Sequence, residues 1–267
     1  MEIEHFPRLI GNSAVTPIEN GWRLGMPAGD NRSYRLAQLD DYIDLGRGRF
    51  KHSFPWTMRL RARVLGADIP GTWGFGLWND PFGFSIGFGG KKRRLPALPQ
   101  VTWFMHASKP NWLSFRDKPL PVSGRNVPAN GFFAGTFRSP HIPSILFTPG
   151  VLALPLLAIR PGARLLRRLA SKLIRQDGIG IDTKVADWHE YSIQWLEGEC
   201  VFVIDGNKIL HTPISPRPPL GLVIWIDNQF AAWTPEGRIG YGVLENEVAW
   251  MEIEGLSIQQ EYTMKKT

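Results

Sequence analysis

The stretch from residue 188 to 228 constrains the fold more than any other part of this chain, because its residues follow the pattern of β-strands. Residues 191–195 alternate apolar with polar side chains, which predicts a strand with one buried face. After a short turn, residues 200–204 form an apolar partner strand. An Asp-Gly-Asn reversal at 205–207 then favours a hairpin, because Gly accepts a positive φ without steric cost. Residues 221–226 are again apolar and β-branched, so the stretch predicts an antiparallel sandwich unit.

Other parts of the chain carry the same pattern. Residues 57–65 alternate apolar and basic side chains, and residues 100–106 and 250–258 also indicate strands. The 28 Gly and 22 Pro residues are scattered, which is typical of many short strands joined by turns. A chain of 267 residues with 43% hydrophobic residues can bury one large core, so we expect a single β-sandwich domain over residues 1–267.

Two motifs resemble the concanavalin A-like jelly roll of laminarinases and their relatives in glycoside hydrolase family sixteen. In that family a Trp-bearing strand and a YVDG hairpin precede a long strand, as Trp195 and Asp205-Gly206 do here. Residues Gly76-Leu77-Trp78 match the start of the family's GLWPAFW strand, whereas residues 79–81 replace its middle. The resemblance implies an all-β, antiparallel jelly-roll β-sandwich.

The family's catalytic acids are missing. Residues 100–106 correspond in position to the strand that bears Glu-x-Asp followed by a second Glu, and this chain contains no Glu-x-Asp. A retaining glycosidase needs two carboxyl groups that face one another across the scissile bond. We therefore do not expect standard retaining glycosidase activity.

Two strand ends share a pattern that suggests chemistry. Asn79-Asp80 follows Trp78, and Asp227-Asn228 closely follows Trp225. The resemblance places both strands in the concave sheet, so we expect the two carboxylates to form an acid/base pair in one cleft. A carboxyl group beside indole rings is desolvated, which raises its pKa. The alternative is that both aspartates are turn residues that bond to their own backbone.

Further candidates surround this pair. His106 ends the strand where the family keeps its acids, although a lone strand histidine is more often structural. Five tryptophans can provide stacking surfaces for sugar rings or flat hydrophobic molecules, or can belong to the core. These tryptophans are Trp73, Trp78, Trp103, Trp225 and Trp233.

Residues 145–176 form an insertion relative to the family. Its first part, 145–159, is almost free of charge but is too short and too interrupted by Pro to span a bilayer. Pro161 then opens a predicted helix over 162–176, with leucines on one face and basic residues on the other. This composition is typical of a lid or a membrane-surface element, for which the candidate residues are Leu152, Leu156, Leu165, Leu169, Arg164, Arg167 and Arg168. The alternative is a helix whose apolar face packs on the sandwich.

Metal and cofactor chemistry has little support in the sequence. The single cysteine, Cys200, excludes an internal disulfide and a cysteine-based metal site. Asp40, Asp41 and Asp44 are candidate ligands of a structural calcium ion, but they lack the spacing of a calcium loop, and a solvated loop is the expected structure for 38–49. We expect no other cofactor.

The net charge of +7 suits an anionic partner. The charge lies in runs at 91–94 and 160–175 that are not interleaved with aromatic residues, so we do not expect nucleic-acid binding. The first residues are acidic and lead into no apolar segment, which favours a cytoplasmic location, peripheral to the inner membrane face if the insertion contacts lipid.

Three functional hypotheses follow. The first is an enzyme that performs acid/base chemistry on a hydrophobic or glycolipid-like small molecule through Asp80, Asp227 and His106. The second is a non-catalytic, lectin-like carbohydrate-binding module that uses the tryptophans. The third is a glycan hydrolase with relocated acids. The missing acid motif and the insertion favour the first hypothesis. The fold alone does not choose among the three, because function depends on the site.

Overall fold

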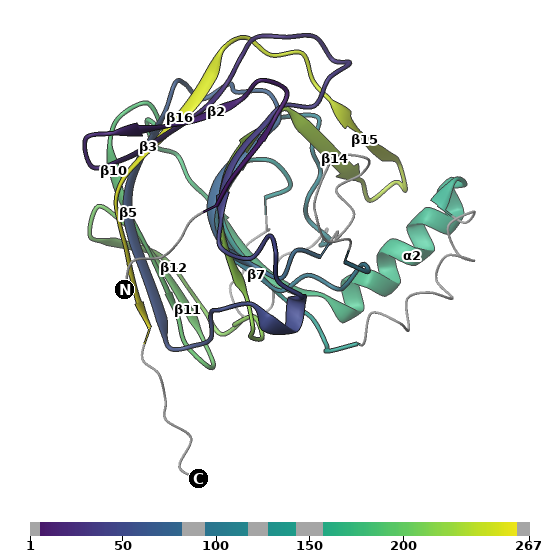
Figure 1. Ribbon diagram of the computed structural model, residues 1–267. Helices are drawn as coiled ribbons and strands as arrows, with labels where there is room; N and C mark the ends of the chain where they lie inside the picture. The colour runs from purple at the N-terminus through teal and green to yellow at the C-terminus, as the bar shows by residue number, and fades with distance from the viewer. Residues whose placement is uncertain (1–5, 82–93, 117–127, 143–156, 261–267) are drawn as a thin grey trace.

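A computed structural model describes residues 6–81, 94–116, 128–142 and 157–260 and shows two antiparallel seven-stranded sheets packed face to face (Figure 1). Sheet A contains, in spatial order, β1 (Phe6–Ile10), β4 (Leu36–Asp40), β13 (Gly221–Asp227), β6 (Thr72–Trp78), β7 (Val101–Ala107), β8 (Gly131–Arg138) and β9 (Arg175–Gly180). Sheet B contains β12 (Asn207–Thr212), β11 (Cys200–Ile204), β10 (His189–Trp195), β5 (Trp56–Val64), β16 (Ala249–Gln260), β3 (Gly21–Met26) and β2 (Ala14–Ile18).

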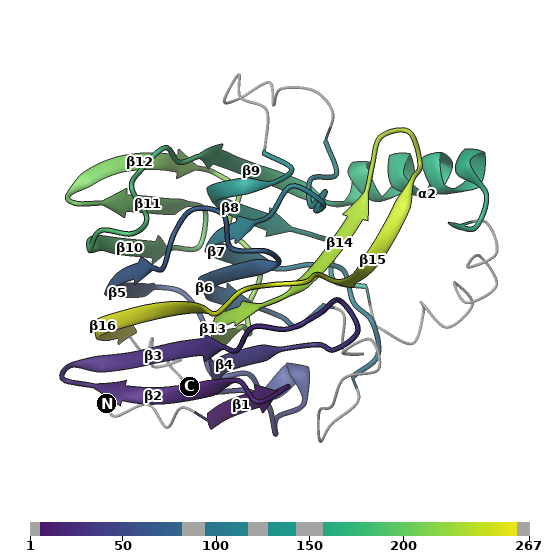
Figure 2. The same ribbon diagram turned by 90° about the horizontal axis from the view of Figure 1, so that it is seen from above.

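Among the described residues, a 3-10 turn, a two-stranded hairpin and a helix lie outside the two large sheets. A 3-10 turn, η1 (Arg47–Arg49), follows β4, and the hairpin of β14 (Gln229–Trp233) and β15 (Ile239–Val243) follows β13. The helix α2 (Arg160–Leu173) precedes β9. The hairpin and α2 lie on the side of sheet A that faces away from sheet B (Figures 1 and 2). Sheet A is therefore the middle layer of the molecule.

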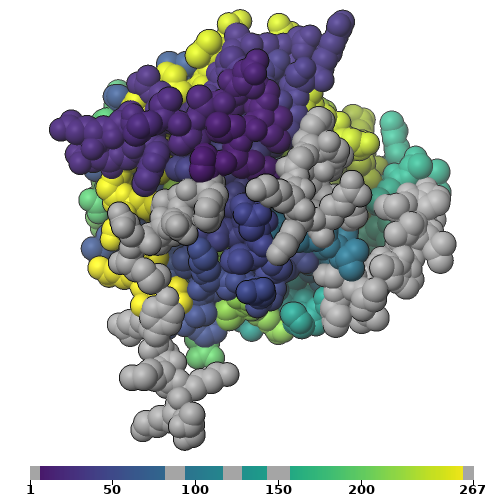
Figure 3. Space-filling view, in the orientation of Figure 1, coloured from purple at the N-terminus to yellow at the C-terminus, as the bar shows by residue number. Residues whose placement is uncertain are grey.

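The predicted all-β, antiparallel jelly-roll sandwich is confirmed. The alternating segments became β5, β10 and β11, and the Asp-Gly reversal is a tight hairpin turn with φ of 50° at Asp205 and 76° at Gly206. Segments from the two ends of the chain lie side by side, since β16 pairs with β3. Figure 3 shows these parts as adjoining yellow and purple surfaces.

Sheet A buries both of its faces, which explains why its strands β7 and β13 are buried along their whole length. One set of alternate side chains packs between the sheets, including Phe75, Phe104 and Ile224. The other set, including Trp103 and Trp225, forms a second apolar cluster on the opposite face. A strand covered on both sides needs apolar residues at successive positions, as β13 has.

The expectation of a solvated loop over residues 38–49 is wrong for the first residues of that segment. It begins inside the buried strand β4, and Asp40 is stabilised there by hydrogen bonds from the Gln38 side chain and from the backbone N–H groups of Tyr42 and Ile43. Long-range strand pairing overrode a locally polar sequence.

The helix of the insertion is shorter than predicted and faces the other way. It ends at Leu173, and Arg175 already begins β9. Arg167 is buried, whereas Leu165 and Leu169 are 55% and 48% exposed. The expectation that the leucines face the protein and the arginines face solvent is therefore wrong for these residues. The reason is that Arg167 donates hydrogen bonds to the carbonyl oxygens of Ser114 and Trp233, at 2.7 and 2.8 Å.

Some sequence expectations lie outside the described residues. These include Leu152 and Leu156 of the insertion and the basic residues 91–93. Within the described ranges, no helix combines the length and the apolar character that crossing a membrane requires.

Candidate active site: an aromatic cavity on sheet A

A cavity of about 420 Å³ lies on the face of sheet A that points away from sheet B. Strands β4, β13, β6 and β7 contribute its floor, and residues of the β14–β15 hairpin and of α2 contribute to its walls. Most of the lining is apolar. Its aromatic members are Tyr34, Trp78, Trp103, Phe115, Phe137, Trp225, Phe230 and Trp233.

The strand alternation selects which tryptophans reach the cavity. Trp103 of β7 and Trp225 of β13 lie on the two strands that flank β6, with their ring centroids 5.5 Å apart. A Cβ atom at Gly74 would lie 2.9 Å from the Trp225 ring and 2.4 Å from the Phe104 carbonyl oxygen. Glycine at this position therefore lets the Trp225 indole lie close to the sheet. Trp78 and Trp233 also line the cavity, so four of the five predicted tryptophans are in the expected place.

Asp227 is the buried carboxylate of this cavity. Its Oδ1 accepts hydrogen bonds from the Thr72 hydroxyl at 2.8 Å and from the backbone N–H groups of Thr72 and Gln229 at 3.2 and 3.3 Å. Its Oδ2 accepts one from the Tyr34 hydroxyl at 3.1 Å. The Thr72 hydroxyl in turn accepts a bond from the Trp225 indole N–H at 2.8 Å. A connected set of neutral donors thus fixes the carboxylate.

Burial raises the pKa of Asp227 to about 6, because the desolvation of the carboxylate outweighs the hydrogen bonds that stabilise its charge. The same burial, with the Asp227 charge beside it, raises the pKa of Tyr34 well above its ordinary value. Two of the three donors to Oδ1 are backbone N–H groups, which cannot accept a proton. The acidic proton therefore belongs on Oδ2, and Asp227 can hold or release it near neutral pH.

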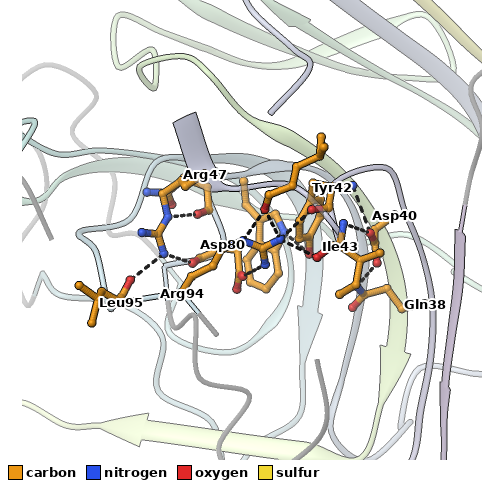
Figure 4. A network of polar contacts seen from close by, with 11 residues as sticks. Gln38, Asp40, Tyr42, Ile43, Arg47, Asp80, Arg94 and Leu95 are labelled. Atoms are coloured by element: carbon orange, nitrogen blue, oxygen red, sulfur yellow. Dashed lines mark hydrogen bonds and ion pairs between the residues drawn. The ribbon is translucent and has the colours of Figure 1, made fainter. Parts of the chain in front are cut away.

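Asp80 has a different environment. Its carboxylate accepts a 2.6 Å ion pair from Arg94, a side chain that also donates to the carbonyl oxygens of Tyr42, Ile43 and Leu45 (Figure 4). Arg47 donates to the carbonyl oxygens of Asn79 and Asp80, at 2.7 Å each. These bonds form a clasp between the β4 loop and the end of β6. Asp80 adopts a φ of 47°, which agrees with the alternative that it is a turn residue.

The two aspartates line the same cavity but at opposite ends. Strands β6 and β13 are adjacent, as expected, but they are antiparallel, and the register pairs Asp227 with Thr72 and Gly221 with Trp78. The strand from Thr72 to Trp78 spans roughly 20 Å, and Asp80 lies beyond it. The expectation of an Asp80–Asp227 acid/base pair is therefore wrong. Each aspartate lies at the C-terminal end of its strand, and the C-terminal ends of antiparallel neighbours lie at opposite edges of the sheet.

His106 and Trp73 face the core between the sheets, not the cavity. Their rings stack with centroids 5.4 Å apart, and burial lowers the pKa of His106 to about 4. Trp73 of β6 pairs with His106 of β7, and each is one residue away from a residue that lines the cavity, Thr72 or Met105. A one-residue change along a strand reverses the face, so the catalytic and ligand-binding assignments of these two residues do not hold.

The two predicted amides are structural. Asn79 bonds to the backbone of Leu98 and Gln100, and Asn228 bonds to the backbone of Ser33, Arg35 and Leu244. Both side chains are buried with all of these bonds made inside the protein. They hold loops beside the cavity and do not offer polar groups to a ligand.

Two of the three candidate calcium ligands, Asp40 and Asp41, have partners within the protein. Asp41 lies 2.6 Å from His52 and accepts a bond from the Leu222 N–H. Asp40 is bonded within β4 and its loop, as described above. Across the described ranges of the chain, His, Cys, Asp and Glu side chains do not gather in groups of three or more that could hold a metal ion.

Two residues of the site were not anticipated from the sequence. Tyr34 is separated from Asp227 by 193 positions, and no local pattern links them. Thr72 lies between Gly71 and Trp73, just before the residues that resemble the family's GLWPAFW strand. The strand alternation could have placed Thr72 on the cavity face, because it is in step with Trp78.

Comparisons with known proteins show a likeness of fold. Neither the known protein families nor the curated proteins contain a match to this chain. Among solved structures, the endo-β-1,4-glucuronan lyase of Trichoderma reesei shares 10% identity over 96% of this chain and 90% of that chain, with a TM-score of 0.48. A family 16 endo-glucanase from Bacteroides ovatus shares 11% over 92% and 85%, with a TM-score of 0.46.

A legume lectin-like domain from Entamoeba histolytica shares 10% identity over 98% of this chain and 99% of that chain, with a TM-score of 0.45. These similar structures are named as a lyase, a family 16 endo-glucanase and a lectin-like domain. At this level of identity, the likeness concerns the fold alone.

Proposed function

We propose that this protein binds a hydrophobic small molecule in the sheet A cavity and transfers a proton to or from it through Asp227. One observation carries the proposal: a carboxyl group with a pKa of about 6 lies in the wall of an aromatic cavity. A general acid or base works best when its pKa lies near the working pH. Asp227 meets this condition without an ionic partner among its hydrogen-bond donors, which are all neutral.

The size and lining of the cavity support a compact apolar ligand. Its volume of about 420 Å³ falls within the range of small-molecule sites, roughly 300–1,000 Å³. Several polar groups of the lining are bonded to the protein: Gln38 to Asp40, Asn111 to the backbone of Ala231, and Arg94 to Asp80. A sugar would need polar partners for each of its hydroxyl groups, whereas a hydrophobic molecule would need only the group that meets Asp227.

A lectin-like function is the alternative. The indole rings of Trp78, Trp103, Trp225 and Trp233 line one cavity and can stack on sugar rings. The third hypothesis, a glycan hydrolase with relocated acids, finds no acid pair in Asp80 and Asp227, because the strand between them spans roughly 20 Å. The two carboxyl groups of a glycosidase lie about 5–10 Å apart.

Identification of the ligand is the first experiment. Native mass spectrometry of the purified protein, followed by denaturing extraction, would reveal a molecule that co-purifies. A bound lipid, terpenoid or glycolipid supports the proposal. An empty protein that binds oligosaccharides on a glycan array supports the lectin-like alternative.

The cavity is then tested with two tryptophan variants. Replacement of Trp103 by Ala should weaken binding of the extracted ligand at least about tenfold, because the ring is part of the floor. The control is Trp188→Ala, since Trp188 stacks with Arg61 and Arg63 on the outer sheet B. Equal effects of the two changes, with both proteins folded, would place the ligand elsewhere.

Proton transfer is tested with Asp227→Asn. The amide keeps the size of the carboxyl group, so binding should persist while turnover of the extracted ligand falls about 10²- to 10⁴-fold. Asp80→Asn is the matched variant at the other end of the cavity and should retain turnover. If the Asp227 variant turns the ligand over at the wild-type rate, Asp227 is not the acid or base.

A further inference from the structure

The outer side of α2 carries two parallel rows of side chains. Leu165, Leu169 and Leu173 follow one another in steps of four, and Arg164, Arg168 and Lys172 do the same one residue earlier. Residues four apart in a helix lie above one another on one face. All six side chains are exposed, and the three leucines are 55%, 48% and 44% exposed. An apolar row and a basic row therefore lie side by side on the surface.

The protein holds these rows outward. Ala163 is buried on the inner side of α2, Ile174 is buried directly after the last residue of α2, and Ala170 and Ile174 line the cavity. The buried Arg167 ties the inner side to the backbone of Ser114 and Trp233. The Trp233 indole donates to the Ala163 carbonyl oxygen at 3.2 Å. Rotation of the leucines toward the protein would break these bonds and leave the carbonyl oxygens of Ser114 and Trp233 without their donor.

We propose that α2 docks on an anionic membrane surface, with the leucine row inserted between lipid headgroups and the basic row paired with phosphates. The helix contains five basic side chains and no acidic one. A helix with adjacent apolar and basic faces binds at the interface of anionic bilayers in this way. Its fourteen residues form a rod of roughly 21 Å that lies along the surface. Docking is independent of the proposed chemistry at Asp227.

Charge argues against a second copy of the chain on this face. A two-fold contact would bring two helices together, each with four exposed basic residues and no acidic one, and like charges would face one another. An anionic lipid surface instead neutralises them. The exposed leucines alone would fit either partner, so the basic row decides between them.

Co-sedimentation with vesicles tests the proposal. The full-length protein should sediment with phosphatidylcholine vesicles that contain phosphatidylglycerol, and not with phosphatidylcholine alone. Loss of the leucine row in L165S/L169S/L173S should weaken binding at least about tenfold. Loss of charge in R168Q/K172Q should weaken it about fivefold per charge.

A control variant removes three leucine or valine side chains of similar exposure elsewhere. Leu9, Leu65 and Val248 are 49%, 48% and 58% exposed and lie away from α2, so L9S/L65S/V248S should bind as the wild type does. Circular dichroism would establish that each variant is folded. Absence of sedimentation by the wild type overturns the proposal. So does a wild-type dimer that the leucine variant converts to a monomer without any effect on vesicle binding.

A labelled cysteine reports on insertion directly. The single native cysteine, Cys200, is 0% exposed, so Leu169→Cys introduces a unique accessible thiol. An NBD dye at this position should shift its emission to shorter wavelength on anionic vesicles. The same dye at Val248→Cys should not shift. No shift at either position would overturn the insertion of the leucine row, and neither result depends on a ligand or on Asp227.

Discussion

Asp80 and Asp227 occupy similar places in the sequence and opposite environments in the structure. Asp80 lies two residues after the tryptophan-bearing strand β6, Asp227 is the last residue of the tryptophan-bearing strand β13, and both line the same cavity. Asp80 meets a guanidinium at 2.6 Å, whereas Asp227 meets only neutral donors. The comparison teaches that the role of a carboxyl group depends on its partners: the guanidinium makes Asp80 part of a structural clasp, whereas burial among neutral donors raises the pKa of Asp227.

The largest effect on stability is expected at the Asp80 end of the cavity. Arg94→Ala would remove the ion-pair partner of Asp80 and leave the carbonyl oxygens of Tyr42, Ile43 and Leu45 without their donor. Loss of a buried pair partner should lower the free energy of unfolding by about 3–5 kcal/mol. Urea denaturation at pH 7 measures it.

The control for this change is Arg168→Ala, since Arg168 is exposed on α2. It should alter the free energy of unfolding by less than about 0.5 kcal/mol. Equal effects of the two substitutions would mean that the clasp around Asp80 does not stabilise the fold, and the contrast between the two ends would disappear.

Asp227, at the other end of the cavity, should make the stability of the protein depend on pH. Folding raises the pKa of Asp227 from 3.8 to about 6. The contribution of Asp227 to the free energy of unfolding is therefore fully present below about pH 4 and is lost as the pH rises through about 6. The difference corresponds to about 3 kcal/mol. Asp227→Asn should remove this part of the pH dependence, as measured by urea denaturation between pH 4 and 7.

His106 acts in the opposite direction over nearly the same range. Its pKa is lowered from 6.5 to about 4, so its contribution is present above about pH 6.5 and is lost as the pH falls through about 4. The wild type alone would therefore show a partly cancelled profile. The comparison of His106→Phe with His106→Phe/Asp227→Asn isolates Asp227, and identical profiles of these two variants would show that Asp227 is not perturbed.

A smaller effect is expected at Thr72. Its hydroxyl stabilises the ionised Asp227 and accepts the Trp225 indole N–H, so Thr72→Val should raise the pKa of Asp227 above about 6. Stability should fall by about 1–2 kcal/mol through the lost hydrogen bonds. The carboxyl carbon resonance of Asp227, assigned with the Asp227→Asn variant, reports the pKa by NMR titration.

The smallest effect is expected at Tyr34. Tyr34→Phe removes one hydrogen bond to Oδ2, which affects the pKa of Asp227 less than the Thr72 hydroxyl does. The pKa should rise, by less than in Thr72→Val, and stability should fall by about 1 kcal/mol. A larger rise in Tyr34→Phe than in Thr72→Val would reverse the ranking of the two donors.

The sequence by itself determined the strands and their sandwich. Alternation of side chains is a local property, and it predicted β5 and β10, while an apolar run predicted β11 and an Asp-Gly pair predicted the turn at Asp205 and Gly206. The sequence also identified four tryptophans that line the cavity, because large aromatic side chains on strands pack against other groups or bind a ligand. It identified Asp227 because this carboxyl group closely follows Trp225.

Only the tertiary structure decided which of these residues meet. Antiparallel pairing separated Asp80 from Asp227, and the register of β7 directed His106 into the core. Arg167 found carbonyl acceptors in distant segments and so turned the leucines of α2 outward, against the pattern of the helix itself. The physical reason is common to all three. Register, strand direction and hydrogen-bond partners depend on contacts between residues far apart in the chain, and a local pattern does not contain them.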